Sequence, residues 1–146
     1  RAVFSYIFGN PEKFGEKVFG FGQSMGAYTL ARVLPDVPRL KGAILEAGLH
    51  SFHELFREAY PKLSCEVPDE GYSALETLPL SPVPKLFIHG TGDAVVPYAH
   101  SVAMHERAAE PKELMLLDGV GHIDAFASRH AREYMQRIVS FIEENS

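Results

Sequence analysis

The sequence predicts an α/β fold in which a parallel sheet carries helices on both faces. Four short apolar runs, each followed by turn residues, are typical of strands that are buried on both sides. Segments with the periodicity of amphipathic helices separate these runs. Such alternation favours a parallel sheet joined by right-handed crossovers. The 146 residues are enough for one domain, and we expect residues 1–146 to form it.

Apolar runs identify the strands, and prolines help to set the limits of the helices. The predicted strands are residues 17–21, 41–47, 85–89 and 113–117. The predicted helices are residues 1–8, 24–34, 51–60, 97–109 and 129–144. Pro35 and Pro61 follow two of these helices, and we expect the first helix to stop near Pro11, because proline breaks a helix that precedes it. Pro97 suits a first helical turn.

Residues 61–84 form the least regular part of the sequence. They contain five prolines, at positions 61, 68, 79, 82 and 84. We expect a short cap-like connection here, with one short helix over about residues 72–78. A short cap predicts an open and permissive site.

Composition excludes several classes of protein. The 14 Lys and Arg residues against 19 Asp and Glu residues give a net charge of −5, which argues against nucleic acid as a partner. The single cysteine, Cys65, allows neither an intrachain disulfide nor a cysteine-based zinc site. The sequence predicts no transmembrane segment and no secretory signal, which favours a cytoplasmic protein. Because the chain opens at Arg1, we expect a processed or excised piece.

A glycine-rich turn around Ser24 carries the strongest chemical signal. The segment Gly22-Gln-Ser-Met-Gly26 follows a predicted strand and opens a predicted helix. This Gly-x-Ser-x-Gly pattern is typical of a nucleophile elbow, in which small residues let the strand and helix approach closely. The N–H of Met25 would then face a developing oxyanion. The alternative is an ordinary strand-to-helix turn with a capping serine.

A serine nucleophile needs a histidine base and an acid to orient that base. In a parallel sheet such residues lie in loops at the carboxyl ends of strands. Asp93 follows the third predicted strand, and His122 follows the fourth. By themselves, Asp93 reads as a turn residue and His122 as a packed loop histidine. Asp118, Asp124 and Glu46 compete with Asp93 for the acid role.

These segments together resemble the C-terminal half of an α/β-hydrolase. The matching blocks are Gly22-Gln-Ser-Met-Gly26, His89-Gly-Thr-Gly-Asp-Ala-Val-Val-Pro97 and Gly119-Val-Gly-His122. They occur in the order Ser, acid, His that is typical of this superfamily. The resemblance covers essentially the whole chain and is strongest to small, nearly lidless esterases, lysophospholipase-like enzymes and serine aminopeptidase-like hydrolases.

The resemblance implies a catalytic triad and a reaction class. Ser24 would be the nucleophile, His122 the general base and acid, and Asp93 the residue that orients His122. The Met25 N–H and a donor upstream of this chain would hold the oxyanion. The implied enzyme is a carboxylesterase-like serine hydrolase that acts on a small-molecule ester or acyl substrate and needs no cofactor.

Other residues admit both a functional and a structural interpretation. Leu49, Phe52 and Phe56 could line an apolar acyl pocket, although such spacing is also typical of core residues. His50 and His53 have a spacing that a metal can use, but no further ligand is evident, and we expect no metal site. His89 ends a strand beside the predicted site, where it would support the site or simply be buried. We expect His100, His105 and His130 on the surface of outer helices.

The family sheet normally has about eight strands, whereas four are predicted here. The resemblance therefore implies an α/β-hydrolase-like sheet that lacks its N-terminal strands. Without a neighbour, the strand at 17–21 would be an exposed apolar edge, and such edges promote association. We expect self-association through residues 17–21, or pairing with another partner.

Three hypotheses on function follow. The first is a serine hydrolase that cleaves carboxylic esters or thioesters through an acyl-enzyme on Ser24, with a serine aminopeptidase-like peptidase as a variant. The second is a non-catalytic α/β-hydrolase-like binding module. The third is an inactive fragment of a longer enzyme.

Overall fold

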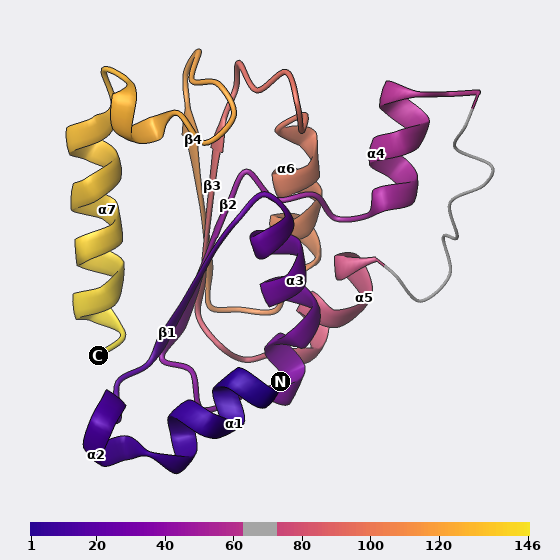
Figure 1. Ribbon diagram of the computed structural model, residues 1–146. Helices are drawn as coiled ribbons and strands as arrows, with labels where there is room; N and C mark the ends of the chain where they lie inside the picture. Colours follow the sequence, from indigo (N-terminus) through magenta and orange to yellow (C-terminus); the bar gives the residue numbers. More distant parts are fainter. Residues whose placement is uncertain (63–72) are drawn as a thin grey trace.

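A single parallel sheet organises the chain. The computed structural model describes residues 1–62 and 73–146. The strands are β1 (Phe19–Gln23), β2 (Gly42–Glu46), β3 (Lys85–Gly90) and β4 (Lys112–Leu117). They pair in parallel in the order β1-β2-β3-β4, so that each strand lies beside the next strand along the chain (Figure 1). The four predicted parallel strands are confirmed, with limits that differ by one or two residues.

Helices alternate with the strands. They are α1 (Ala2–Gly9), α2 (Pro11–Phe14), α3 (Met25–Val33), α4 (Phe52–Ala59), α5 (Ala74–Thr77), α6 (Ala99–Arg107) and α7 (Ala131–Glu144), with short 3-10 turns at Leu34–Asp36, Leu78–Leu80 and Ala125–Ala127. The helix α2 was not predicted. Pro11 does end the first helix, but it also begins the next one, because its missing N–H costs nothing in a first helical turn.

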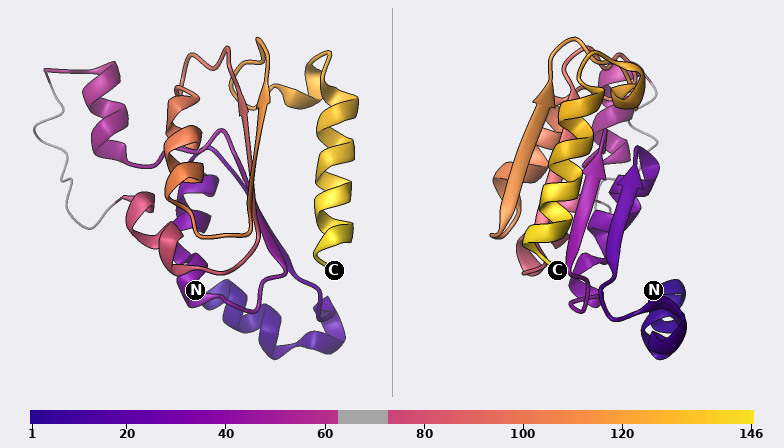
Figure 2. Two further views of the ribbon diagram at one scale, coloured as in Figure 1. Left: turned by 180° about the vertical axis from the view of Figure 1, so that it is seen from behind. Right: turned by 90° about the vertical axis from the view of Figure 1, so that its left-hand side faces the viewer.

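The helices cover both faces of the sheet, as the sequence predicts. The helices α3, α5 and α6 lie on one face and α7 lies on the other (Figures 1 and 2). The α3 side buries the larger core, which includes Leu30, Leu45 and Phe87. The α7 side buries a second core around Ile88 and Phe141. Burial on both faces explains why β2 and β3 read as continuous apolar runs.

The two outer strands leave apolar side chains exposed. The strand β1 lies at one edge of the sheet, as predicted, and 52% of Phe21 is accessible to solvent. On the opposite edge, Leu116 of β4 is 40% exposed. Association through residues 17–21 remains a prediction. Within the described part of the chain, no helix is long and apolar enough to cross a bilayer.

The connection between β2 and β3 is described in part. The short helix expected at 72–78 is observed as α5 (Ala74–Thr77), continued by the 3-10 turn. Tyr72 and Cys65 lie outside the described residues. Lys85, where this connection joins β3, is fully buried. Its Nζ atom donates hydrogen bonds to the carbonyls of Ser81, Val83 and Ala109 at 2.8, 2.7 and 3.0 Å. Burial lowers the pKa of Lys85 to about 8.

Candidate active site

Ser24, Asp93 and His122 meet at the carboxyl end of the sheet. They follow β1, β3 and β4, respectively. The Nε2 atom of His122 lies 3.0 Å from Ser24 Oγ, and its Nδ1 atom lies 2.7 Å from Asp93 Oδ2. This arrangement lets His122 accept a proton from the serine hydroxyl while the carboxylate holds the other ring nitrogen.

The backbone around Ser24 is strained in the way that a nucleophile elbow requires. Ser24 has φ 53° and ψ −118°, a conformation that non-glycine residues rarely adopt. It occupies the N-cap position of α3, but its side chain makes no capping hydrogen bond. Its hydroxyl is therefore available to His122. The Ser24 N–H donates to the carbonyl of Glu46 at 2.9 Å, which ties the turn to β2.

Only one of the two flanking glycines is needed for space. A Cβ added at Gly22 would lie 2.4 Å from the carbonyl oxygen of Gly26, so β1 and α3 require glycine there. A Cβ added at Gly26 would meet nothing within 4 Å. The expectation that both glycines permit close packing is wrong for Gly26, because its backbone, not its Cα hydrogen, makes the close contact.

Met25 is the first residue of α3. The N–H groups of the first helical turn have no intrahelical carbonyl to bind, and the helix dipole favours negative charge beside them. The Met25 side chain is 62% exposed, so the turn is open to solvent. The Met25 N–H belongs to this first turn, directly after Ser24.

Asp93 has a fully buried side chain with both oxygens engaged. Oδ1 accepts hydrogen bonds from the N–H groups of Val95 and Val96 at 2.8 and 2.9 Å, and Oδ2 accepts from His122. Burial acts to raise the pKa of Asp93, but the hydrogen bonds from His122 and the two amides outweigh it and hold the pKa below its ordinary value. The carboxylate is therefore ionised at neutral pH.

Close backbone contact brings the acid loop and the histidine loop together. A Cβ at Gly90 would lie 2.1 Å from the carbonyl oxygen of Val120, so only glycine fits at the end of β3. The N–H of Gly92 donates to Val120 O at 3.0 Å, and the N–H of Gly119 donates to Thr91 Oγ1 at 2.9 Å. These contacts fix the two loops relative to each other.

In the described part of the chain, the competing acids make no hydrogen bond with His122, and two of them pair elsewhere. Asp118 pairs with Arg129 at 2.8 Å on the surface. Glu46 is buried and accepts hydrogen bonds from Tyr134 Oη and Gln23 Nε2, both at 2.8 Å. Asp124 is on the exposed side of the histidine loop. Asp93 is the carboxylate that contacts His122.

His89 has a closer link to the site than the sequence indicated. Its imidazole is fully buried at the end of β3. Nε2 lies 3.1 Å from Asp93 Oδ2 and 2.9 Å from Val96 O, and Nδ1 lies 2.7 Å from Ser101 Oγ on α6. The i to i+4 spacing of His89 and Asp93 was the available signal, but it does not reveal that the loop folds back on the strand.

The predicted pocket residues occupy different environments. Leu49 is buried, Phe52 packs its ring edge against Tyr28 of α3, and Phe56 is partly exposed and lies against Tyr60. Their assignment to an acyl pocket remains a prediction.

The outer histidines differ from expectation at one position. His100 is buried rather than on the surface, with its ring against His50 and its Nε2 atom 3.3 Å from Glu58 Oε2 of α4. His105 and His130 are partly exposed. Among residues 1–62 and 73–146, no cluster of three His, Cys, Asp or Glu side chains could hold a metal ion.

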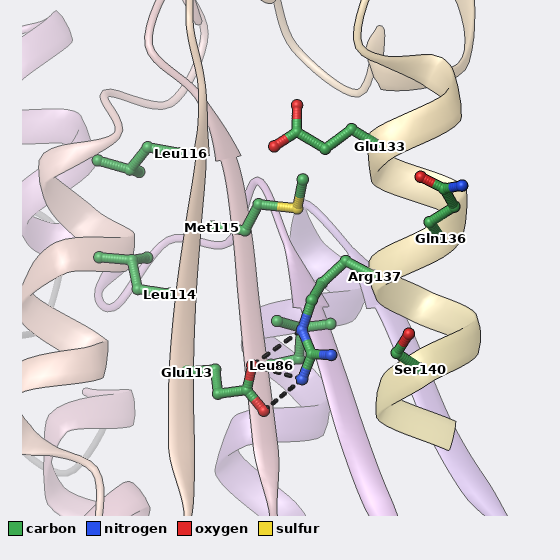
Figure 3. Close-up of a pocket in the computed structure, with 9 residues that line it drawn as sticks. All are labelled: Leu86, Glu113, Leu114, Met115, Leu116, Glu133, Gln136, Arg137 and Ser140. Carbon is green, nitrogen blue, oxygen red and sulfur yellow. Dashed lines mark hydrogen bonds and ion pairs between the residues drawn. The ribbon is translucent and has the colours of Figure 1, made fainter. Parts of the chain in front are cut away.

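A hollow of about 540 Å³ lies away from the serine, between β4 and α7 (Figure 3). Arg137 reaches across it and donates to both carboxylate oxygens of Glu113 at 2.5 to 2.9 Å. The Arg137 guanidinium and the Glu113 carboxylate thus form an ion pair across the hollow.

The chain is similar in sequence to several curated proteins. No protein-family model matches the chain. The uncharacterized protein YfhR of Escherichia coli K12 is 36% identical over 125 residues, which cover 84% of this chain and 44% of that protein. The α/β hydrolase domain-containing protein aho-3 of Caenorhabditis elegans is 33% identical over 137 residues, covering 93% of this chain and 38% of that protein. The chain spans about half the length or less of these curated relatives.

Solved structures show the same architecture. The esterase Pf2001 of Pyrococcus furiosus superposes with a TM-score of 0.77 at 16% identity, covering 98% of this chain and 60% of that chain. The monoacylglycerol lipase of Paleococcus ferrophilus gives a TM-score of 0.72 at 17% identity, covering 99% and 75%. The chain therefore has the α/β-hydrolase fold of these structures.

Proposed function

We propose that this chain carries the catalytic triad of a serine hydrolase that cleaves carboxylic ester or thioester bonds. The observation that carries the proposal is the continuous hydrogen-bond series from Ser24 through His122 to Asp93, built on a strained strand-to-helix turn. Serine at such a turn with a paired histidine is the arrangement that activates a hydroxyl as a nucleophile.

The geometry supports an acyl-enzyme route in two halves. Ser24 Oγ attacks the substrate carbonyl carbon while His122 Nε2 takes the hydroxyl proton, and Asp93 stabilises the resulting imidazolium. The carbonyl π electrons move to oxygen, and the Met25 N–H donates to that oxyanion. His122 then protonates the departing alcohol or thiol as its bond to carbon breaks. Water repeats these steps to release the acid and restore Ser24.

The names of similar structures support an ester substrate, and one of them makes amide cleavage the alternative to be tested. Two of them are named an esterase and a monoacylglycerol lipase. A third, the acylaminoacyl peptidase of Pyrococcus horikoshii, has a TM-score of 0.73 at 20% identity and covers 97% of this chain and 27% of that chain. The same triad can expel an amine, so amide cleavage is the alternative that a substrate panel must separate.

Labelling with a fluorophosphonate probe tests the proposal directly, because the probe reacts with activated serines. The full natural polypeptide should be labelled, and Ser24→Ala and His122→Ala should each abolish labelling. Ser140→Ala, a change in the distant hollow beside α7, is the matched control and should label normally. A folded parent that does not react would refute the proposal. Hydrolysis of matched ester, thioester and anilide substrates then identifies the leaving group.

A further inference from the structure

We propose that His89 is a positioning residue, which holds the Asp93 carboxylate in the orientation in which it contacts His122. The inference rests on the proposed function, in which Asp93 orients the base. It extends the hydrogen-bond series inward by two buried side chains, so that the order becomes Ser101, His89, Asp93, His122 and Ser24.

The contacts of His89 determine which ring nitrogen carries the proton. Nε2 faces two acceptors, Asp93 Oδ2 at 3.1 Å and Val96 O at 2.9 Å, so it must be the N–H donor. Nδ1 lies 2.7 Å from Ser101 Oγ, whose hydroxyl can donate to it. Ser101 thus supplies a donor to the unprotonated nitrogen of His89. Burial lowers the pKa of His89, against the opposing effects of Val96 O and Asp93, so the ring is neutral when it donates.

A neutral donor on Oδ2 has two consequences for Asp93. The carboxylate receives four hydrogen bonds, two on each oxygen, so it cannot rotate away from His122 without breaking several of them. In addition, Oδ2 is shared between two imidazoles. A shared oxygen is a weaker acceptor for each of its donors, so loss of the His89 contact would strengthen the hydrogen bond between His122 and Asp93.

His89 has a second contact, to Val96 O, that is merely structural, because it closes the loop after β3. A variant could therefore fail through loop geometry alone, and the test must separate the two roles. The titratable groups that face His89 are Asp93 and His122, and α6 contributes the uncharged Ser101. A change in the titration of His122 would therefore report on the Asp93 contact.

The test compares three substitutions in the full natural polypeptide. His89→Phe keeps a planar ring and removes the hydrogen bonds to Asp93, Val96 and Ser101. His89→Gln retains an amide N–H donor and an acceptor. Ser101→Ala leaves His89 in place and removes the hydroxyl that contacts its Nδ1. Each is measured by the pH titration of the His122 ring in NMR spectra, by kcat and KM, and by urea unfolding.

We expect His89→Phe to move the His122 titration to higher pH and to lower kcat about 10- to 100-fold with little change in KM. His89→Gln should bring the His122 titration and kcat most of the way back to the parental values. Ser101→Ala should shift the titration in the same direction as His89→Phe, but by a smaller amount. If the folded His89→Phe protein keeps the parental titration and kcat, the proposal is overturned. If His89→Phe does not fold, an unchanged titration in both Ser101→Ala and His89→Gln with normal stability overturns it.

Failure of the proposed function gives a different result. A parent that does not react with the fluorophosphonate probe refutes the hydrolase assignment. The NMR titration of His122 needs no turnover, so it still decides whether His89 acts on His122 through Asp93.

Discussion

Lys85 makes the stability of this protein depend on pH in an unusual direction. Its side chain is fully buried at the start of β3, and its ammonium donates hydrogen bonds to three carbonyl oxygens. Burial lowers its pKa from 10.5 to about 8, so the folded protein releases this proton at a lower pH than the unfolded chain. Between these two values the unfolded chain binds more protons, and the free energy of unfolding must therefore rise with pH.

The magnitude follows from the two pKa values. At about pH 7 the ammonium is charged in both states, and the cost of burying it is fully present. At about pH 9.5 most folded molecules have lost this proton while most unfolded ones keep it, which stabilises the fold by about 2 kcal/mol relative to about pH 7. Lys85→Met removes the titration and also leaves three carbonyls without their donor, at a cost of about 1–3 kcal/mol at neutral pH.

Urea unfolding at several pH values measures this effect. The parent should gain stability from about pH 7 to about pH 9.5 relative to Lys85→Met, whose own pH dependence comes from the other groups. Lys41→Met, a change at an exposed lysine, should behave like the parent. Equal slopes for the parent and Lys85→Met would show that the Lys85 ammonium titrates normally and that the reasoning from burial is wrong.

Three further predictions concern the site. Gly22→Ala should abolish fluorophosphonate labelling, because its Cβ would lie 2.4 Å from Gly26 O, whereas Gly26→Ala, which meets nothing within 4 Å, should keep the native circular dichroism spectrum. Asp93→Asn should lower kcat by about 10⁴-fold because it favours the wrong His122 tautomer, which steady-state kinetics would measure; a loss below tenfold would contradict the role of Asp93. Tyr134→Phe removes one donor to the buried Glu46 and should cost about 1–3 kcal/mol in urea unfolding, and unchanged stability would show that water replaces it.

The elements that sequence predicts well are those with a local signal. Apolar runs marked the four strands because strands buried on both faces need apolar side chains at successive positions. Ser24, Asp93 and His122 each follow a predicted strand, which places them at the same edge of a parallel sheet. In the structure their side chains are in contact.

The features that were missed depend on distant neighbours. Lys85 reads as the polar start of a strand, and its three acceptors come from two separate connections. The contacts of His100 are with His50 and Glu58, which follow a different strand. The contact of His89 with Asp93 depends on how the loop after β3 turns back. In each case a polar side chain is buried because a tertiary partner satisfies it, and periodicity carries no information on that partner.

The order of the strands determines how far His122 must reach. Ser24 follows β1 and His122 follows β4, at opposite edges of the sheet. Three strand spacings of about 4.8 Å separate these edges, or about 14 Å, yet the two side chains are within hydrogen-bond distance. The loop after β4 therefore turns back over the end of β3, where Val120 O accepts from Gly92 N–H, and carries His122 toward β1. Ile123, the residue after His122, adopts a φ of 51°. Shortening this loop by one residue would withdraw the base from the serine while every strand kept its place.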